Sequence, residues 1–139
     1  MDRIVEQAQV CHLGLCDGEG PYVVPVCFGY DGRALYFHSA PRGRKIRAIA
    51  ADGAVCFEVE TDVELVPAER ACKWSIRYRS VMGTGRAALV EDAEGKRRAL
   101  NAIMRKYSGQ DWDFGGFDLN RVAVVRIEIE SMTGKTAGY

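Results

Sequence analysis

The chain has 139 residues, and 47% of them are hydrophobic. This length predicts one domain, spanning residues 1–139, with enough apolar side chains to bury a core. The 19 basic and 19 acidic residues give a net charge of zero, which argues against nucleic acid or an acidic membrane as a partner. No run approaches the roughly 18 apolar residues of a membrane span, and the N-terminal residues do not resemble a signal peptide.

The cysteine and histidine patterns exclude several kinds of site. The five cysteines are an odd number without a C-x-x-C pair, which suits reduced thiols in a cytoplasmic protein better than a disulfide framework or a zinc site. No His/Cys/Asp cluster has metal-ligand spacing, and no paired carboxylates or Ser–His–Asp pattern stands out. The sequence therefore predicts no metal and gives little support for hydrolytic chemistry.

The chain begins with a predicted helix and strand. A short helix is expected over residues 2–9. A half-buried strand follows over residues 10–16, because Cys11, Leu13 and Leu15 alternate with His12 and Gly14.

The next strands are separated by a tight turn. The strand expected over residues 22–28 contains Pro25, which cannot donate to a sheet ladder, so this strand should be kinked or lie at an edge. Asp31-Gly32 is a favoured hairpin dipeptide, so the strands on either side of it should pair antiparallel.

The rest of the chain reads as further strands and two helices. A helix is expected over residues 42–51, with Ile46, Ile49 and Ala50 inward and Gly53 as its C-terminal cap. Residues 54–60 alternate as a strand. The remaining expectations are a loop over 61–73, a strand bent by Gly83 and Gly85 over 74–90, a helix over 91–107, a packed aromatic loop at 112–117, a strand over 121–131 and a loose tail over 132–139. Together these elements predict a mainly β protein, a small β-barrel with a few helices.

Basic residues open the first of these two helices. Arg42, Arg44 and Lys45 fall in its first turn, where the helix dipole makes cations unfavourable. A bound anion such as a phosphate would explain them, because free backbone N–H groups also favour an anion there. Solvated surface cations are the alternative, and charge alone does not separate the two.

Three motifs, in this order, resemble a known family. They are PYVVPVCFGYDGRALYFHSA, then GRKI followed by VCFEVE, then KWSIRYRSVMGTGRAALVED. Together they resemble the pyridoxamine 5′-phosphate oxidase-like flavoproteins, and within them the nitroimidazole-resistance group. The resemblance extends over about residues 10–135.

The resemblance implies an FMN-binding split β-barrel that forms a homodimer, with FMN at the subunit interface. Cofactor contacts are implied for three groups of residues. Pro25, Val26 and Cys27 would touch the flavin ring mainly through backbone atoms, and His38 and Ser39 would lie beside it. Arg44 and Lys45 would hold the phosphate, Ser80 would contact the flavin, and Trp74 or Tyr78 would line the pocket from either subunit.

Two departures from the family pattern affect the expected chemistry. Cys27 stands where relatives often have Asn, so a hydrogen bond near the flavin is lost; a small apolar filler is its default role. Residues 121–139 contain no counterpart of the Arg and His that bind substrate in pyridoxamine 5′-phosphate oxidases. Vitamin B6 is therefore not the expected substrate.

The function expected from the resemblance is that of an FMN-dependent oxidoreductase. Electrons would pass from NADH or NADPH to a small-molecule acceptor such as a nitroimidazole. His38 is the candidate proton donor, with a structural role as its alternative, and His12 is expected to be structural. The competing hypotheses are an F420-dependent reductase and a non-enzymatic binder of flavin or haem.

Overall fold

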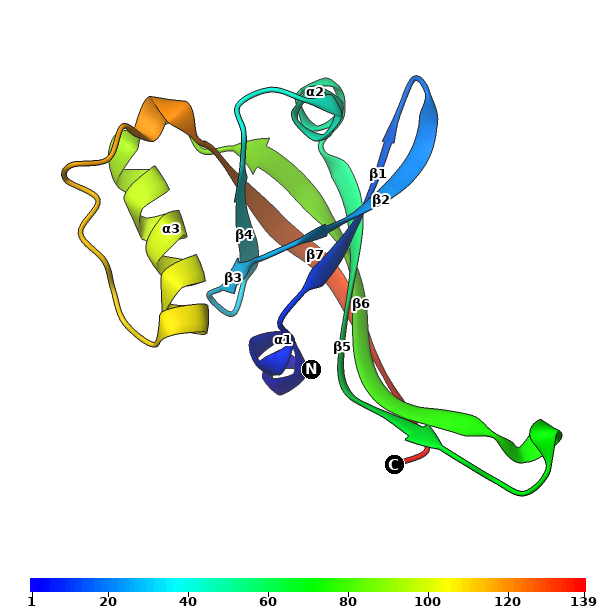
Figure 1. The fold of residues 1–139 in the computed structure, drawn as a ribbon. Coiled ribbons are helices and arrows are strands. Elements are labelled where there is room, and N and C mark those ends of the chain that lie inside the picture. Colours follow the sequence, from blue (N-terminus) through cyan, green and yellow to red (C-terminus); the bar gives the residue numbers. More distant parts are fainter.

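Seven strands form one antiparallel sheet in a computed structural model that describes residues 1–139 (Figure 1). The strand order is β2-β1-β5-β6-β7-β4-β3, and the sheet coils into a barrel. The strands are β1 (Cys11–Asp17), β2 (Gly20–Val26), β3 (Gly29–Tyr30), β4 (Ala34–Ser39), β5 (Ala54–Val66), β6 (Ser75–Leu89) and β7 (Ala123–Ala137). This confirms the predicted β-barrel with a few helices.

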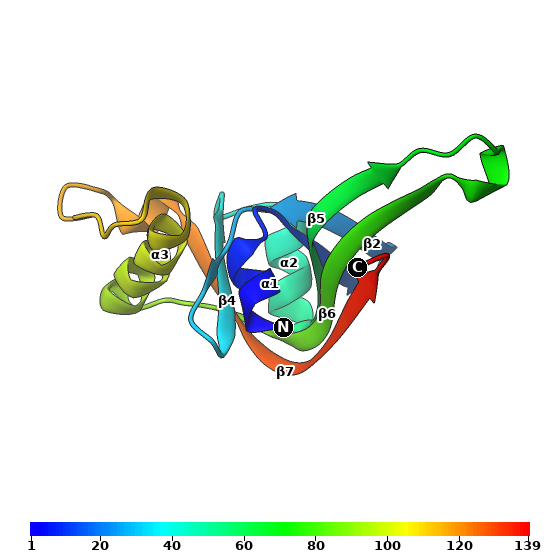
Figure 2. The same ribbon diagram turned by 90° about the horizontal axis from the view of Figure 1, so that it is seen from below.

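The helices occupy two different positions. Figure 2 shows α1 (Asp2–Gln7) and α2 (Arg44–Ala51) within the ring of strands and α3 (Ala93–Ser108) outside it. Val5 of α1 and Ile46 of α2 belong to the main core, whereas Leu100 of α3 packs in a second cluster with Val124 of β7. Two short 3₁₀ turns complete the list, Ala71–Lys73 and Leu119–Arg121. No helix combines the length and the apolarity needed to cross a membrane.

The alternation predicted for β1 is confirmed. Cys11, Leu13 and Leu15 are buried in the main core, and His12 and Gly14 point to the other face of the sheet. The edge position predicted from Pro25 is confirmed as well, since β2 is the first strand of the sheet.

The predicted hairpin around Asp31-Gly32 is only partly correct. The turn joins two antiparallel strands, but only Gly29 and Tyr30 pair with β4. The longer strand β2 pairs with β1 instead. The break comes at Phe28, whose backbone N–H donates to the Tyr107 hydroxyl of α3 (3.0 Å) rather than to a strand.

The start and the C-terminal cap of α2 differ from the prediction, whereas its last residue, Ala51, is the predicted one. The helix starts at Arg44 because Gly43 has a φ of 129°, a non-helical conformation that suits glycine. At the other end Asp52 caps the helix in an extended conformation. Gly53 is required for another reason: a Cβ there would lie 2.4 Å from the carbonyl oxygen of Ala87. The inward stripe is also corrected, because Ala48 is buried and Ala50 is exposed.

The ordered strands extend further than predicted. Residues 61–66 belong to β5, and the end of the β5–β6 hairpin projects away from the barrel in both views (Figures 1 and 2). The tail expected to be loose instead continues β7 to Ala137, because residues 132–137 pair with Tyr78–Gly83 of β6. A register shift between Thr84 and Gly85 marks the predicted bend in β6.

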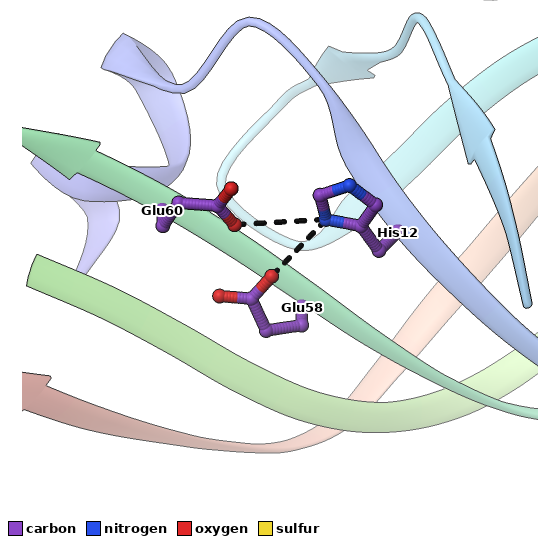
Figure 3. A group of neighbouring side chains, drawn as sticks. All are labelled: His12, Glu58 and Glu60. Atoms are coloured by element: carbon purple, nitrogen blue, oxygen red, sulfur yellow. Dashed lines mark hydrogen bonds and ion pairs between the residues drawn. The ribbon is translucent and has the colours of Figure 1, made fainter. Parts of the chain in front are cut away.

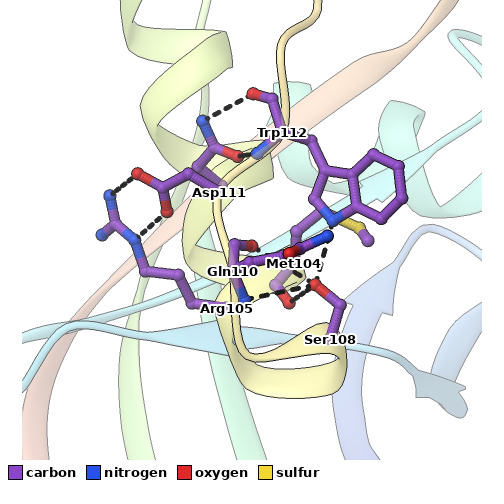
Figure 4. A network of polar contacts seen from close by, with 7 residues as sticks. Met104, Arg105, Ser108, Gln110, Asp111 and Trp112 are labelled. Atoms are coloured by element: carbon purple, nitrogen blue, oxygen red, sulfur yellow. Dashed lines mark hydrogen bonds and ion pairs between the residues drawn. The ribbon is translucent and has the colours of Figure 1, made fainter.

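The aromatic loop after α3 is held by polar contacts, as Figure 4 shows. The Trp112 indole Nε1 donates to Ser108 Oγ (2.9 Å), and the Asn101 amide bonds to both backbone groups of Trp112. Arg105 forms an ion pair with Asp111. The predicted packing is only partly correct, because Phe114 packs against the second core cluster whereas Trp112 and Phe117 are about half exposed.

Replacing Gly29 should test how closely α3 packs on the sheet. A Cβ at Gly29 would lie 2.5 Å from backbone atoms of Ala102 and Ile103, so Gly29→Ala forces the helix outward. We expect a loss of about 1–3 kcal/mol in the free energy of unfolding, measured with urea. Gly18→Ala is the control, because nothing lies within 4 Å of its Cβ position. Equal stability of the two variants would contradict this packing.

Candidate functional site

The barrel is split between β2 and the second half of β4. β2 is the first strand of the sheet, and β3 pairs only with Leu35 and Tyr36 of β4. The outer edge of Phe37–Ser39 therefore has no partner strand. We call the opening bordered by β2 and Phe37–Ser39 the barrel split; α2 follows directly after it in the chain.

The β2 side of the split carries three residues predicted to contact a flavin. Val26 is buried in the core, whereas Pro25 and Cys27 are exposed on the outer face. A ring placed on this face would meet the proline, the thiol and the backbone. The following Phe28 is fixed by Tyr107, whose hydroxyl accepts from its N–H and donates to the Gln9 carbonyl (2.7 Å).

The β4 side carries His38 and Ser39. His38 is exposed and lies opposite Val124 in the β4–β7 ladder, and its imidazole makes no hydrogen bond within the chain. The Ser39 hydroxyl donates to the neighbouring Ala40 carbonyl (2.8 Å). The His38 side chain is thus free to meet a ligand.

The N-terminus of α2 is open. Gly43 supplies no side-chain cap, and the first hydrogen bond of the helix runs from Arg47 N–H to the Gly43 carbonyl (3.1 Å). The backbone N–H groups of Arg44, Lys45 and Ile46 have no partner. Such a terminus suits an anion, both through its N–H groups and through the helix dipole.

Arg44 is already engaged by the β1–β2 hairpin. Its Nε and Nη2 donate to the two carboxylate oxygens of Asp17 (2.8 and 3.0 Å), and its guanidinium stacks 4.0 Å from the centre of the Tyr22 ring. This fork lowers the pKa of Asp17 to about 2. Nη1 makes no hydrogen bond, so Arg44 has one amino group left for a ligand.

Lys45 and Arg42 are free of ion pairs. The Lys45 ammonium makes no hydrogen bond and lies 5.7 Å from the centre of the Phe37 ring, beside the split. Arg42 is exposed and contacts no carboxylate. Of the two predicted phosphate ligands, Lys45 is therefore the uncommitted one, and Arg44 positions α2 on the hairpin.

The remaining predicted residues lie on or next to β6, which β1 and β5 separate from β2 in the sheet. Ser80 is the only buried residue with a polar side chain. Tyr78 lies under the Lys135 ammonium, 5.4 Å from the ring centre. Trp74 is 51% exposed and follows the 3₁₀ turn Ala71–Lys73 that connects β5 to β6. One chain does not bring these three residues onto the split.

A cavity adjoins β2 on the outer face of the sheet. It has a volume of about 650 Å³ and includes Gly14, Val23 and Cys56 in its lining. None of the predicted flavin residues lines it. Within a single chain those residues form an open surface, because Pro25 and His38 are both exposed.

The structure also assembles a cluster that the sequence analysis missed. His12 Nδ1 lies 3.2 Å from a Glu58 carboxylate oxygen and 3.6 Å from a Glu60 oxygen (Figure 3). His12 is 46 residues from Glu58 along the chain, and only the pairing of β1 with β5 brings them together. Spacing along the sequence could not reveal this group, and the prediction that the protein holds no metal remains untested by it.

Comparison with known proteins assigns the fold to a class. Residues 1–136 match the family model described as pyridoxamine 5′-phosphate oxidase. A crystal structure from Bacteroides thetaiotaomicron, provisionally described as that of a 5-nitroimidazole antibiotic resistance protein, is 38% identical with a TM-score of 0.85; the match covers 97% of this chain and 81% of that one. A search of curated protein sequences gives no match.

More distant structures share the fold alone. A FAD and heme binding protein from Mycobacterium smegmatis is 20% identical, with a TM-score of 0.83 and coverage of 99% of this chain and 70% of that one. A structure described as an F420 reductase is also 20% identical, with a TM-score of 0.61 and coverage of 95% and 94%.

The fold and the family match together define a split-barrel protein of the flavin-binding type. The chain belongs to the pyridoxamine 5′-phosphate oxidase-like family, whose members are generally oxidoreductases.

Asp17→Asn should change the pH dependence of the free energy of unfolding. The low pKa of Asp17 means that its ionised form stabilises the native state fully above the ordinary pKa of 3.8, and that this contribution is lost as pH falls towards 2. Urea unfolding at several pH values across this window should show a shallower acid loss for Asp17→Asn than for the parent. Asp113→Asn, at a carboxylate that contacts no basic side chain, should keep the parent's slope; identical slopes for all three proteins would contradict the ion pair.

Proposed function

We propose that this protein binds FMN at the barrel split and acts as an FMN-dependent reductase. The observation that carries the proposal is the open N-terminus of α2, with the unpaired Lys45 ammonium beside it. A phosphate there would accept hydrogen bonds from the three free N–H groups and form an ion pair with the Lys45 ammonium. The free Nη1 of Arg44 would add a donor without breaking the Asp17 ion pair.

The flavin ring would lie against the outer face of β2. Pro25 and Cys27 are exposed there, and the Tyr107 hydroxyl holds the adjoining backbone. A tyrosine hydroxyl keeps its proton at neutral pH, and burial raises the pKa of Tyr107 further, so the hydroxyl can donate the hydrogen bond to Gln9. The ring site is thus supported by contacts already made within the chain.

A second copy of the chain would complete the site. The predicted residues on or next to β6 cannot reach the split of their own chain, and the projecting hairpin exposes apolar side chains that include Val63, Leu65 and Trp74. A homodimer would cover this surface and could place Trp74 or Tyr78 over the partner's flavin. This arrangement also explains why a single chain encloses no pocket around the predicted residues.

The reaction would oxidise NADH or NADPH and reduce a small acceptor, with a nitroimidazole as the first to test. When bound, FMN supplies the hydride and electron transfer. His38 is the proposed proton donor to the acceptor, because its imidazole is exposed at the split and makes no bond within the chain. The similarity to the Bacteroides protein supports the choice of acceptor.

A non-enzymatic haem binder is the second candidate. The structure leaves only one histidine for it, since His12 already contacts two carboxylates and His38 alone is free. An F420-dependent reductase would use the same phosphate anchor, so cofactor titration must separate it from the FMN enzyme.

Lys45→Ala should weaken FMN binding roughly ten- to a hundred-fold, the loss expected for one charge-assisted hydrogen bond. The dissociation constant can be measured by quenching of flavin fluorescence. Arg97→Ala on α3 is the control, because Arg97 is an exposed cation on a different helix and has no ion pair. Arg44→Ala should weaken FMN binding too, but it should also lower the free energy of unfolding, because the ion pair between Arg44 and Asp17 is lost. Unchanged affinity in a folded Lys45→Ala protein would refute the phosphate site.

A further inference from the structure

His12, Glu58 and Glu60 gather on the outer face of the sheet, on strands β1 and β5 (Figure 3). We propose that these three side chains form a binding site for a divalent transition-metal ion, held by one imidazole nitrogen and two carboxylate oxygens. The proposal does not rest on FMN binding, since no residue of the cluster is among the proposed flavin contacts. His12 is nevertheless the ladder partner of Pro25 of the proposed ring site, so zinc binding is measured on the FMN-free protein.

The spacing of the three donor atoms fits one small cation. The distances from His12 Nδ1 to the two carboxylate oxygens are 3.2 and 3.6 Å, and all three donor atoms lie within 4.8 Å of one another. Donors bound to zinc at about 2.0–2.2 Å in a tetrahedral arrangement lie roughly 3.4 Å apart. Small rotations of the Glu60 side chain would therefore complete the set.

The backbone holds the donors in place. His12 lies directly opposite Glu58 in the β1–β5 ladder, and Glu60 is two residues further along, so all three point to the same face. Sites built on paired strands are more rigid than sites on loops. A bound ion would connect β1 to β5.

The charges favour a cation here. The other carboxylates that take part in ion pairs all face an arginine, whereas Glu58 and Glu60 face only His12. Two adjacent carboxylates without a lysine or arginine would repel each other at neutral pH, and a divalent ion would neutralise both.

The donor set and the exposure indicate the class of ion. Imidazole with carboxylates suits zinc, manganese, iron, cobalt or nickel, and disfavours ions that need sulfur. Between 32% and 39% of each side-chain surface is exposed, which lets an ion reach the site and leaves room for a water ligand. Three protein ligands with an open position resemble catalytic rather than closed structural zinc sites.

The test is a titration of the purified protein with zinc chloride, measured by isothermal titration calorimetry. We expect one ion per chain for the parent. Glu58→Gln and Glu60→Gln should each weaken binding at least tenfold, and His12→Ala should do the same. The glutamine variants keep the shape of half-exposed side chains, so they should fold; circular dichroism and thermal unfolding check this. Zinc should raise the melting temperature of the parent but not that of the double glutamine variant.

Two control variants separate this site from the other possible zinc ligands. His38→Ala removes the only other histidine, and Cys56→Ser removes the exposed thiol two residues before Glu58. Both should bind zinc as the parent does. If the parent holds no zinc after dialysis against zinc chloride at the concentration of the protein, the cluster is only a hydrogen-bonded ion pair and the proposal is wrong. Parent-like affinity in the double glutamine variant, or loss of binding in Cys56→Ser alone, would also overturn the proposal.

Discussion

Strand β2 and residues Phe37–Ser39 of β4 each have one edge without a partner strand in this chain. The proposed chemistry depends on those two free edges. Exposed edges leave backbone groups without partners, and proteins usually cover them. Pro25 makes β2 a poor template for another strand, and Tyr107 satisfies the Phe28 N–H where the strand ends. What remains open is a surface suited to a planar ligand.

The two basic residues that open α2 have different tasks. Arg44 joins the helix to the β1–β2 hairpin through Asp17, which places the open helix terminus beside the split. Lys45 remains free to meet an anion. The planar fork of arginine suits the bidentate carboxylate contact, whereas the lysine ammonium acts as a mobile point charge. Of the three cations predicted for the first turn, Arg42 lies before the helix, Arg44 is paired with an internal carboxylate, and Lys45 would meet the proposed phosphate.

Much of this arrangement could be predicted from the sequence because it rests on local signals. Alternation identified the buried face of β1, and a single proline indicated an edge strand. The order of the motifs identified the family, which periodicity alone could not have done. The loose tail was predicted wrongly because its partner, the Tyr78–Gly83 segment of β6, is distant in sequence. The Arg44–Asp17 pair and the His12 cluster were missed because each joins residues that are distant in sequence. The first depends on the packing of α2 against the β1–β2 hairpin, and the second on the pairing of β1 with β5.

The central claim is that the barrel split holds FMN and uses it for reduction. The most direct test is the visible absorption spectrum of the purified protein, recorded before and after addition of NADH and NADPH without oxygen. We expect the two visible bands of an oxidised flavin, bleaching of these bands by one of the two donors, and release of FMN when the protein is denatured. A colourless protein that cannot be reconstituted with FMN, or one that shows a haem spectrum instead, would contradict this claim.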